Sequence, residues 1–421
     1  MPDHPAAPLR LLYIHQHFST PDGAVGTRSY AFARAAIARG HQVSMLCGGY
    51  QGAATGLGGA FAGGVREGLV DGIHVVELAA AAGNAQTPAT RARRFARFAL
   101  AASWRAARAG ADLVYATSTP LTVAIPALVA RATGTPYVFE VRDLWPELPV
   151  AMGMIANPGV VALLSGLEWA AYRGARATVA LSDGMAAGVA RRGIAAAKIA
   201  VIPNGCDLEL FTPDGPPAPA PWLGAGETAA IYAGAHGRAN GLDHLLDVAP
   251  HLQGSGVRIV LCGDGAEKPR LMARAASEGL ANVTFLDPLP RREIPSLLRA
   301  GGIGIQSLAD VAAFREGTSP NKLMDYIATG LPVVINYPGW AARLLEEAGA
   351  GIAPARDPAA FAAALAGLAG DAGRRAAMGD AARRLAATRF DRAALGEKFV
   401  AVIEAAAARR QVASLAPRLA A

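Results

Sequence analysis

The sequence contains few cysteines and few aromatic side chains. Its 421 residues include 3 cysteines, Cys47, Cys206 and Cys262, and aromatic residues make up 6% of the chain. Cysteines this sparse and this far apart exclude a disulfide scaffold, show no metal-ligand spacing and suit a reducing compartment. Because no basic segment followed by an apolar one opens the chain, we expect no secretory signal.

Charge is also scarce, and long apolar runs without helix breakers are missing. Charged residues make up 17% of the chain and apolar residues 52%, which predicts a packed globular protein. The longest uncharged run, residues 148–167, is interrupted by prolines and glycines, so we do not expect it to span a membrane. The net charge of +7 favours an anionic partner such as a phosphate, a membrane surface or nucleic acid, and does not choose among them.

Two series of short apolar strands alternate with helical segments. The first series opens with a strand at 9–15, a glycine-containing loop, a helix at 28–39 and a strand at 41–47. This βαβ order predicts a parallel sheet. The second series begins with a strand at 228–233, after a proline-rich segment whose composition is typical of a linker.

The pattern therefore predicts an α/β fold with two doubly wound, Rossmann-like domains that face each other across a cleft. We place the first domain at residues 1–205, the linker at 206–221 and the second domain at 222–395. Ligands of such sheets bind beyond the carboxyl ends of the strands. Site residues are therefore expected in the loops that follow the strands.

Residues 316–334, EGTSPNKLMDYIATGLPVV, have the pattern of an anion site at the start of a helix. We expect Ser319 as the N-cap and Pro320 as the first helical residue, which puts Asn321 and Lys322 in the first turn. Free N–H groups and a partial positive charge favour an anion there, and Lys322 adds a full charge. This arrangement suits a diphosphate leaving group, which gains charge as its bond breaks. The alternative is ordinary capping beside a solvated lysine.

The same segment resembles the donor site of retaining glycosyltransferases of family 4, and other segments resemble further parts of that family. They are VIPNGCD at 201–207, IVLCGDGAEKPRL at 259–271 and NVTFLDPLP at 282–290. HQHFSTPDGAVGTRSY at 15–30 and FEVRDLWPELP at 139–149 resemble the branch that builds bacterial surface polysaccharides, including transferases of sugars such as N-acetylfucosamine. The resemblance covers nearly the whole chain, and it rests on the order and spacing of the motifs.

The resemblance implies a GT-B fold and the transfer of a sugar, with retention of configuration, from a nucleotide-diphosphate donor that we expect to be a UDP-sugar. The second domain would bind the donor and the first a lipid-linked or saccharide acceptor, and a helix at about 396–421 would cross back to the first domain. It implies a cytoplasmic enzyme, peripheral on the cytoplasmic face of the bacterial inner membrane, with no cofactor and no nucleic-acid partner. Two alternatives stay open, a sugar-nucleotide epimerase of the same fold and a non-catalytic partner of an active transferase.

The glycine loop of the second domain departs from the family pattern. The family commonly has an Arg and a Lys in this loop, and residues 234–241, GAHGRANG, have Ala235 and Asn240 in those places. Arg238 is the only cation left in the loop, so we expect Arg238 and Lys322 to share the diphosphate. The donor-binding residues that the resemblance implies are Gly234, Asn240, Gly263, Ser319, Asn321 and Asp325, with Asp325 accepting hydrogen bonds from both ribose hydroxyls.

The first acid of the family's donor segment is also displaced. Its place falls at Gly317, and we infer a slipped loop that lets the neighbouring Glu316 reach the donor sugar. No two aspartates are separated by a single residue anywhere in the chain, so the Asp-x-Asp device for holding a metal-bound sugar nucleotide is missing. We therefore expect no metal site and a metal-independent activity.

The predicted catalytic residue of the first domain is Arg142, which stands where many relatives have a histidine. Arg142 could bind a donor or acceptor oxygen, and it could equally pair with Asp143 or Glu147. On the acceptor side, Gly23 and Gly26 allow a ligand to approach the backbone closely. The complete acceptor-side set consists of Gly23, Gly26, Arg28 and Asp143.

A basic helix is expected at residues 91–108. Five of its arginines and Trp104 fall within an arc of roughly 120°, opposite a face of alanines. These arginines are Arg93, Arg94, Arg97, Arg105 and Arg108. The alanines of that face are Ala96, Ala99, Ala102, Ala106 and Ala107. Basic residues mixed with aromatic ones suit the surface of an anionic bilayer, so we predict membrane contacts from Arg93, Arg94, Arg97 and Trp104. The alternative is a solvated basic face on a helix that packs through its alanines.

Overall fold

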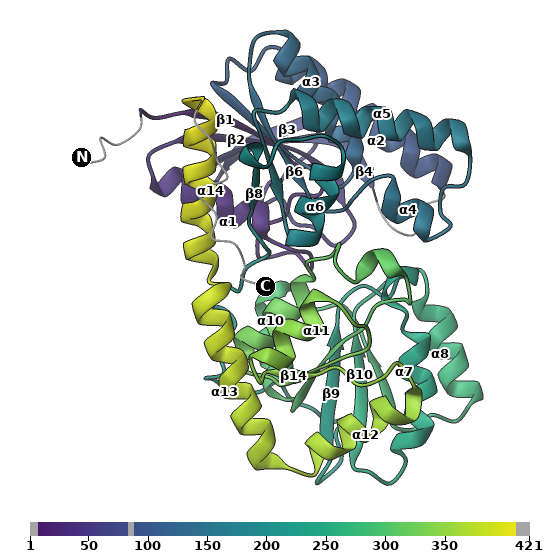
Figure 1. Cartoon of the computed structure of the whole chain (residues 1–421). Coiled ribbons are helices and arrows are strands. Elements are labelled where there is room, and N and C mark those ends of the chain that lie inside the picture. Colours follow the sequence, from purple (N-terminus) through teal and green to yellow (C-terminus); the bar gives the residue numbers. More distant parts are fainter. Residues whose placement is uncertain (1–6, 83–87, 410–421) are drawn as a thin grey trace. The chain divides into compact units, whose positions relative to one another are not determined.

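The chain divides into two compact units, which are described separately here (Figure 1). The structure, a computed structural model, describes residues 7–82 and 88–409. The first unit contains the chain up to Pro203, Gly317–Ser319 and the residues from Ala393 onward. The second unit contains Asn204–Glu316 and Pro320–Arg392.

The first unit is built on an eight-stranded sheet with the strand order β3-β4-β2-β1-β5-β6-β7-β8. All neighbouring strands are parallel except the β3–β4 hairpin. The central strands are continuous apolar runs such as LVYAT in β5, which is typical of a parallel sheet covered on both faces. The strands are β1 Arg10–Ile14, β2 Gln42–Tyr50, β3 Val65–Val70, β4 Ile73–Ala82, β5 Leu113–Thr117, β6 Tyr137–Val141, β7 Ala177–Ala180 and β8 Ile199–Val201.

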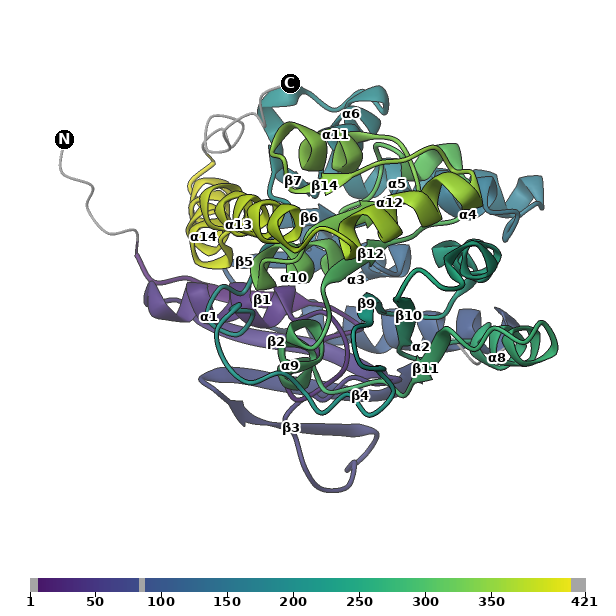
Figure 2. The same ribbon diagram turned by 90° about the horizontal axis from the view of Figure 1, so that it is seen from below.

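Helices cover both faces of this sheet (Figure 2). One face packs against α1 and α14, where the Phe32 and Phe399 rings stack with their centroids 4.7 Å apart. The other face packs against α2, α3, α5 and α6. The helices of this unit are α1 Arg28–Ala38, α2 Pro88–Ala106, α3 Ala124–Ala132, α4 Glu147–Ala151, α5 Pro158–Gly174, α6 Asp183–Arg191 and α14 Arg392–Ala407.

The second unit has a six-stranded, fully parallel sheet with the order β11-β10-β9-β12-β13-β14. Its strands are β9 Thr228–Ala233, β10 Val257–Cys262, β11 Val283–Leu286, β12 Ile303–Gln306, β13 Val333–Ile335 and β14 Gly351–Ile352. Its helices are α7 Asp243–Val248, α8 Lys268–Ser277, α9 Ile294–Arg299, α10 Asn321–Thr329, α11 Trp340–Glu347, α12 Pro358–Ala369 and α13 Ala372–Arg389. Because the strands run in one direction, the loops after β9 and β10 and the start of α10 meet at one edge of the sheet.

Residues 206–221 are not the free linker that their composition suggests. They belong to the second unit, where the Phe211 side chain is fully buried and the Arg291 guanidinium lies 4.7 Å from its ring centroid. The Arg299 side chain also donates hydrogen bonds to the carbonyls of Thr212 and Pro216, both at 3.1 Å. The prolines prevent regular secondary structure in this segment, but they do not prevent it from packing.

Candidate functional site

The start of α10 has a proline at its N-cap position, and this proline offers no side-chain cap. The helix begins at Asn321, and Pro320 takes the N-cap position with no side-chain hydrogen bond. The N-cap position predicted for Ser319 is therefore taken by Pro320, because the helix starts one residue later than its sequence suggests. The first N–H groups of a helix have no partner within the helix, so an uncapped start favours an anionic ligand.

Lys322 lies in this first turn and is half-buried. Its Nζ donates a hydrogen bond to Asn240 Oδ1 at 3.0 Å and lies 5.0 Å from the centroid of the Tyr232 ring. A Cβ atom at Gly234 would come within 2.9 Å of Lys322 Cε, so the loop after β9 needs glycine beside the lysine stem. The structure thus brings Gly234, Asn240 and Lys322 together, and it contradicts the alternative of a solvated lysine.

Burial lowers the pKa of Lys322 to about 8, and the nearby Asp325 charge opposes this shift. The ammonium is therefore held in a site that withholds water from it. A diphosphate at the α10 start would supply the negative charge that this lysine lacks.

The Asp325 carboxylate forms a buried ion pair that the sequence did not indicate. Its two carboxylate oxygens accept hydrogen bonds from the Arg291 guanidinium at 2.6 and 3.1 Å, and both side chains are buried. The expected role of Asp325 in binding ribose stays a prediction, because each carboxylate oxygen that accepts from Arg291 keeps a second lone pair. This ion pair connects α10 to Arg291, which lies just before α9.

Gly263 supports the site through the backbone. Its φ of +143° suits glycine, and a Cβ atom there would lie 2.0 Å from the Gly234 carbonyl oxygen. Gly265, with φ +159°, approaches the His236 backbone in the same manner. These glycines let the loop after β10 press against the loop after β9, so the predicted donor residue Gly263 positions its neighbour Gly234.

Arg238 is exposed in the short turn Arg238–Asn240 that follows the same loop. It lies two residues before Asn240, whose amide binds Lys322. Gly241 then turns the chain with φ +57°, and a Cβ atom there would lie 2.8 Å from the Ala309 backbone. The tight turn holds the Arg238–Asn240 segment in place, while the Arg238 guanidinium remains accessible.

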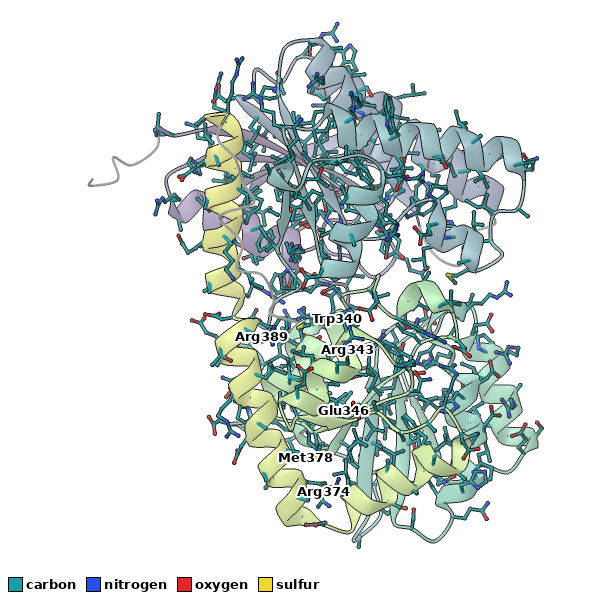
Figure 3. The ribbon with its side chains drawn as sticks, in the orientation of Figure 1. Trp340, Arg343, Glu346, Arg374, Met378 and Arg389 are labelled. Carbon is teal, nitrogen blue, oxygen red and sulfur yellow. The ribbon has the colours of Figure 1, made fainter. Side chains whose placement is uncertain are left out.

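Glu316 forms an ion pair with a residue that the sequence reasoning missed. Its carboxylate accepts hydrogen bonds at 2.9 and 3.0 Å from Arg343. Arg343 lies on helix α11 (Figure 3). Gly339 makes this possible, because its φ of +133° lets the start of α11 approach the Arg315 backbone. The expected reach of Glu316 toward a donor sugar stays a prediction, because its ion pair with Arg343 is exposed to solvent.

In the first unit, polar residues gather where β1, β5 and β6 end. His15 is buried, with Nδ1 2.5 Å from Ser29 Oγ and Nε2 3.3 Å from an Arg142 guanidinium nitrogen. Asp143 accepts a hydrogen bond from Thr119 Oγ1 at 2.8 Å. The Arg142 guanidinium forms no ion pair with Asp143 or Glu147 and instead contacts His15, which the sequence did not indicate.

Burial and the Arg142 charge lower the pKa of His15 well below its ordinary value, so the imidazole is neutral. A neutral ring accepts at Nε2 from Arg142 only when Nδ1 carries the proton, which it then donates to Ser29. Burial also raises the pKa of Asp143. The end of this sheet therefore presents the Arg142 guanidinium beside a neutral imidazole that orients it.

Arg28 is not part of an open acceptor loop. It lies in α1, is buried, and its guanidinium donates to Glu140 Oε1 at 2.9 Å and to the Ile202 carbonyl at 2.7 Å. Gly23 is also buried, and a Cβ atom there would lie 2.3 Å from Ser19 Oγ, while Gly26 is half-buried. The expectation for Arg28 is corrected because an ion pair inside the unit uses its charge.

Helix α2 exposes most of the predicted basic face and buries most of the predicted alanine face. Arg93, Arg97 and Trp104 are exposed, and Arg94 is half-buried. Ala99, Ala102 and Ala106 are buried as expected, whereas Ala96 is exposed. Among the described residues, no helix is long and apolar enough to cross a bilayer, and no cluster of His, Cys, Asp or Glu could hold a metal ion.

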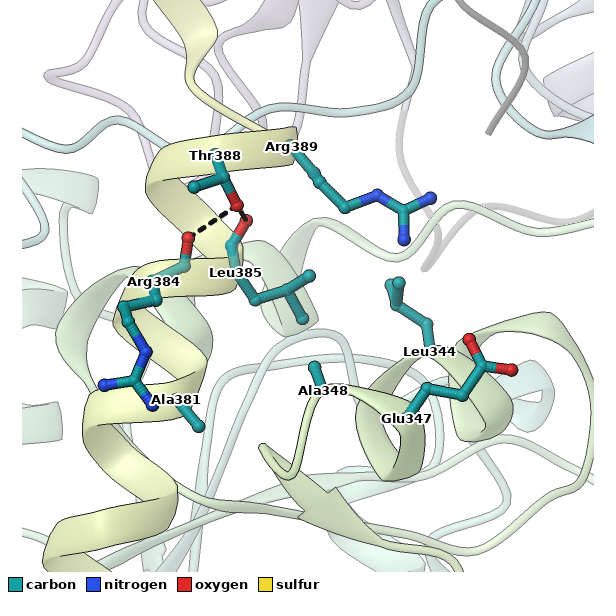
Figure 4. Close-up of a pocket in the computed structure, with 8 residues that line it drawn as sticks. All are labelled: Leu344, Glu347, Ala348, Ala381, Arg384, Leu385, Thr388 and Arg389. Atoms are coloured by element: carbon teal, nitrogen blue, oxygen red, sulfur yellow. Dashed lines mark hydrogen bonds between the residues drawn. The ribbon is translucent and has the colours of Figure 1, made fainter. Parts of the chain in front are cut away.

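A shallow groove lies between α11 and α13 of the second unit (Figure 4). Thr388 at its rim donates a hydrogen bond to the Arg384 carbonyl at 2.8 Å, so this hydroxyl is used within its own helix. None of the predicted site residues lines the groove. The residues that line it are Leu344, Glu347, Ala348, Ala381, Arg384, Leu385, Thr388 and Arg389.

Two α/β units, each built on a largely parallel sheet, are the architecture of the GT-B fold. Residues 23–205 match the glycosyl transferase 4-like domain, and residues 227–371 match the glycosyl transferases group 1 family. Together these two domains span most of both units. Each unit therefore matches a glycosyltransferase domain, and the architecture of the two units is that of the GT-B fold.

Curated relatives and a solved structure agree with this family. The chain is 30% identical over 212 residues to a D-inositol 3-phosphate glycosyltransferase of Corynebacterium urealyticum, covering 45% of this chain and 47% of the relative. It is 24% identical over 262 residues to WcaI of Escherichia coli, named as a candidate colanic acid biosynthesis glycosyl transferase, covering 57% and 61%. The match therefore spans about half to three fifths of the length of these relatives. The structure of Anabaena HepE in complex with UDP and glucose superposes with a TM-score of 0.68 at 20% identity, covering 94% of this chain and 99% of HepE.

Proposed function

We propose that this protein transfers a sugar, with retention of configuration, from a nucleotide-diphosphate donor that is a UDP-sugar. The observation that carries the proposal is the half-buried Lys322 ammonium at the uncapped start of α10, 3.0 Å from Asn240. The second unit binds the donor, and the first unit binds a lipid-linked or saccharide acceptor of surface-polysaccharide synthesis. The UDP bound to the HepE structure and the colanic acid name of WcaI support this choice of substrates.

The chemistry follows from the charges around α10. The bond between the sugar anomeric carbon and the diphosphate oxygen breaks, and the Lys322 ammonium and the free N–H groups stabilise the charge that develops on that oxygen. Arg238, which is exposed two residues from Asn240, contacts the outer phosphate oxygens. Lys322 replaces part of the hydration of the diphosphate with a fixed positive charge.

Retention of configuration requires the acceptor hydroxyl to bond to the anomeric carbon on the face that the diphosphate leaves. The hydroxyl proton then passes to the departing phosphate oxygen, so no protein nucleophile takes part. Arg142 of the first unit, oriented by His15, stabilises a sugar or acceptor oxygen. The work of the protein in this scheme is positioning and charge stabilisation.

The test is binding followed by turnover. A ligand that binds only the folded state raises the melting temperature, so UDP and UDP-sugars should raise it for the parent protein and much less for Lys322→Ala. Turnover of the UDP-sugar only when an acceptor is present supports a transferase. Conversion of the UDP-sugar to an epimer without an acceptor would assign an epimerase instead, and no binding of any nucleotide diphosphate would assign a non-catalytic partner.

A further inference from the structure

Three half-buried rings meet in the first unit where β1 and β2 end. Between ring centroids, His17 lies 4.2 Å from Tyr50 and 6.1 Å from Phe95. His17 follows β1, Tyr50 ends β2 and Phe95 lies on α2, so three elements contribute one ring each. Core rings of the same unit, such as Tyr13 and Phe32, are fully buried, whereas these three remain partly open to solvent. Rings that are held together and partly open can serve as a binding surface.

The residue before His17 carries a buried amide whose hydrogen-bonding capacity is unused. Gln16 is 0% exposed, and among the described residues neither its Oε1 nor its Nε2 has a hydrogen-bond partner. A buried amide that loses its water without gaining a partner destabilises the fold, so such a group requires an explanation. The Gln16 amide offers an acceptor oxygen and two N–H donors to a ligand.

The imidazole of His17 also has an unused nitrogen. Its Nε2 is buried, and no partner for it occurs in the part of the chain that the structure describes. Burial, together with the charges of Arg142 and Arg91, lowers the pKa of His17 to about 3, so the ring is neutral near pH 7. A neutral imidazole has one N–H donor and one acceptor nitrogen. Unused polar atoms therefore lie beside the aromatic rings.

These groups are held in place next to Arg142. The Gly48 N–H donates a hydrogen bond to the Gln16 carbonyl at 3.1 Å, and a Cβ atom at Gly48 would lie 3.5 Å from Gln16 Cγ. The His15 ring, whose Nε2 contacts the Arg142 guanidinium, lies 6.4 Å from the His17 ring between centroids. The rings and the amide are therefore preorganised beside the arginine that we assign to a sugar or acceptor oxygen.

We propose that Gln16, His17, Tyr50 and Phe95 form the acceptor-sugar subsite, which holds a pyranose ring with two neighbouring hydroxyls. The aromatic faces pack against the apolar C–H face of the pyranose. Gln16 Oε1 accepts a hydrogen bond from one hydroxyl, and Nε2 donates a hydrogen bond to the next. Aromatic walls with a few placed polar groups are typical of small-molecule sites. The proposal rests on the proposed sugar transfer and specifies the part of the acceptor that the first unit binds.

Two other occupants fit the acceptor-sugar subsite less well. The hydrocarbon chain of a lipid-linked acceptor would cover the rings but leave the Gln16 amide and His17 Nε2 unpaired. An internal water would pair with the amide but leave the rings partly open. A pyranose satisfies both, because it has an apolar face and a polar edge.

The experiment measures binding of methyl glycosides of glucose, galactose and mannose by saturation-transfer difference NMR, without a donor. The parent protein should transfer saturation to the ring C–H protons of at least one glycoside. Tetrahydropyran, which has the ring but no hydroxyls, should receive much less. Tyr50→Ala should lower glycoside affinity by about fivefold or more, because a stacking ring is lost. Its matched control is Tyr30→Ala, a half-buried tyrosine on α1 of the same unit, which should bind like the parent.

Gln16→Leu separates a contact with the ligand from a structural role. It should lower glycoside affinity by about fivefold or more, because two hydrogen bonds are lost. The melting temperature should stay the same or rise, since an apolar side chain of similar size replaces a buried group without a partner. In transfer assays the acceptor KM should rise by a similar factor, while UDP should still raise the melting temperature of the variant.

Four results would overturn the proposal. The first is no saturation transfer from the parent to any of the glycosides, and the second is equal loss of binding in Tyr50→Ala and Tyr30→Ala. The third is a lower melting temperature in Gln16→Leu with glycoside binding retained, which would assign the amide to an internal water. The fourth uses octyl β-glucoside below its micelle concentration: stronger saturation of the octyl chain than of the glucose ring, lost in Tyr50→Ala, would assign the rings to hydrocarbon.

The same measurements distinguish a failure of the acceptor-sugar subsite from a failure of the proposed function. Glycoside binding by a parent protein whose melting temperature does not respond to UDP or UDP-sugars would count against the donor site alone. A response to UDP without glycoside binding would count against the acceptor-sugar subsite alone.

Discussion

Lys322 Nζ and Asn240 Oδ1 lie 3.0 Å apart and join the start of α10 to the loop after β9. Asn240 occupies the place where the resembled family commonly has a cation. A neutral amide there leaves Lys322 as the half-buried charge of the site and gives its ammonium a fixed direction. The site therefore depends on one lysine more strongly than a site with three cations would.

Removal of Lys322 should affect the chemical step more than folding. We expect Lys322→Ala to lower kcat by about a hundredfold or more, in line with the roughly 3–4 kcal/mol lost when a preorganised donor to developing charge is deleted. Because its hydrogen bond to Asn240 is also lost, the free energy of unfolding should fall by about 0.5–1.5 kcal/mol. Steady-state transfer and urea unfolding measure the two effects. Lys398→Ala on α14 is the control, and near-normal kcat in Lys322→Ala would remove the diphosphate assignment.

The affinity for UDP should depend on pH through Lys322. Its pKa is lowered to about 8, so the ammonium is charged below this pH and loses its proton above it. The dissociation constant should therefore rise as pH increases through about 8. In Lys322→Arg the side chain stays charged to much higher pH. The dissociation constant of this variant should therefore change little between pH 7 and about 9.5, even if its affinity for UDP is lower. Calorimetric titration with UDP at several pH values measures the dissociation constant. Parallel pH profiles for the parent and Lys322→Arg would refute the assignment of this pH dependence to Lys322.

Breaking the buried Arg291–Asp325 pair should destabilise the second unit. Asp325→Ala leaves the Arg291 guanidinium buried without its partner, which costs about 3–5 kcal/mol. The exposed Glu316–Arg343 pair is the internal comparison, since Glu316→Ala should cost at most about 1 kcal/mol. Denaturant unfolding of both variants checks the difference. Equal losses would mean that the Arg291 contact does not hold α10.

His15 should act on the reaction through Arg142. His15→Ala removes the acceptor at Nε2, and losing a hydrogen bond to a charged group is worth about 1.5–3 kcal/mol, or a fall in kcat of about tenfold to a hundredfold. UDP affinity should be unchanged, because the donor contacts lie in the second unit. A variant that keeps a side-chain acceptor, His15→Gln, should recover part of the kcat. A loss of UDP affinity in step with kcat would indicate a general structural defect.

Transfer should persist in excess EDTA, because Lys322, Arg238 and the α10 N–H groups supply the positive charge that the diphosphate requires. The measurement compares rates with EDTA, with added Mg²⁺ and with added Mn²⁺. Abolition by EDTA with recovery on adding metal would contradict the expectation.

The alternation of apolar runs and glycine loops was sufficient to predict both parallel sheets. The segment at 316–334 was sufficient to place Lys322 in the first turn of a helix. The hairpin strand β3 was not predictable, because its sequence VREGLV has no long apolar run and its pairing with β4 is set by tertiary contact. Asp325 shows why the contacts of the candidate site could not all be predicted from the sequence. Its place in the motif suggested a ligand for ribose, whereas its partner Arg291 lies 34 residues away and could be identified only from the folded chain.

The return of α14 to the first unit has a consequence for synthesis on the ribosome. Phe399 packs between Tyr13, Phe32 and Tyr115, so the core of the first unit stays open until the last helix has emerged. The second unit is translated entirely before α14, and its sheet can close first. The usual order of vectorial folding, in which the N-terminal domain matures first, is therefore reversed in this chain.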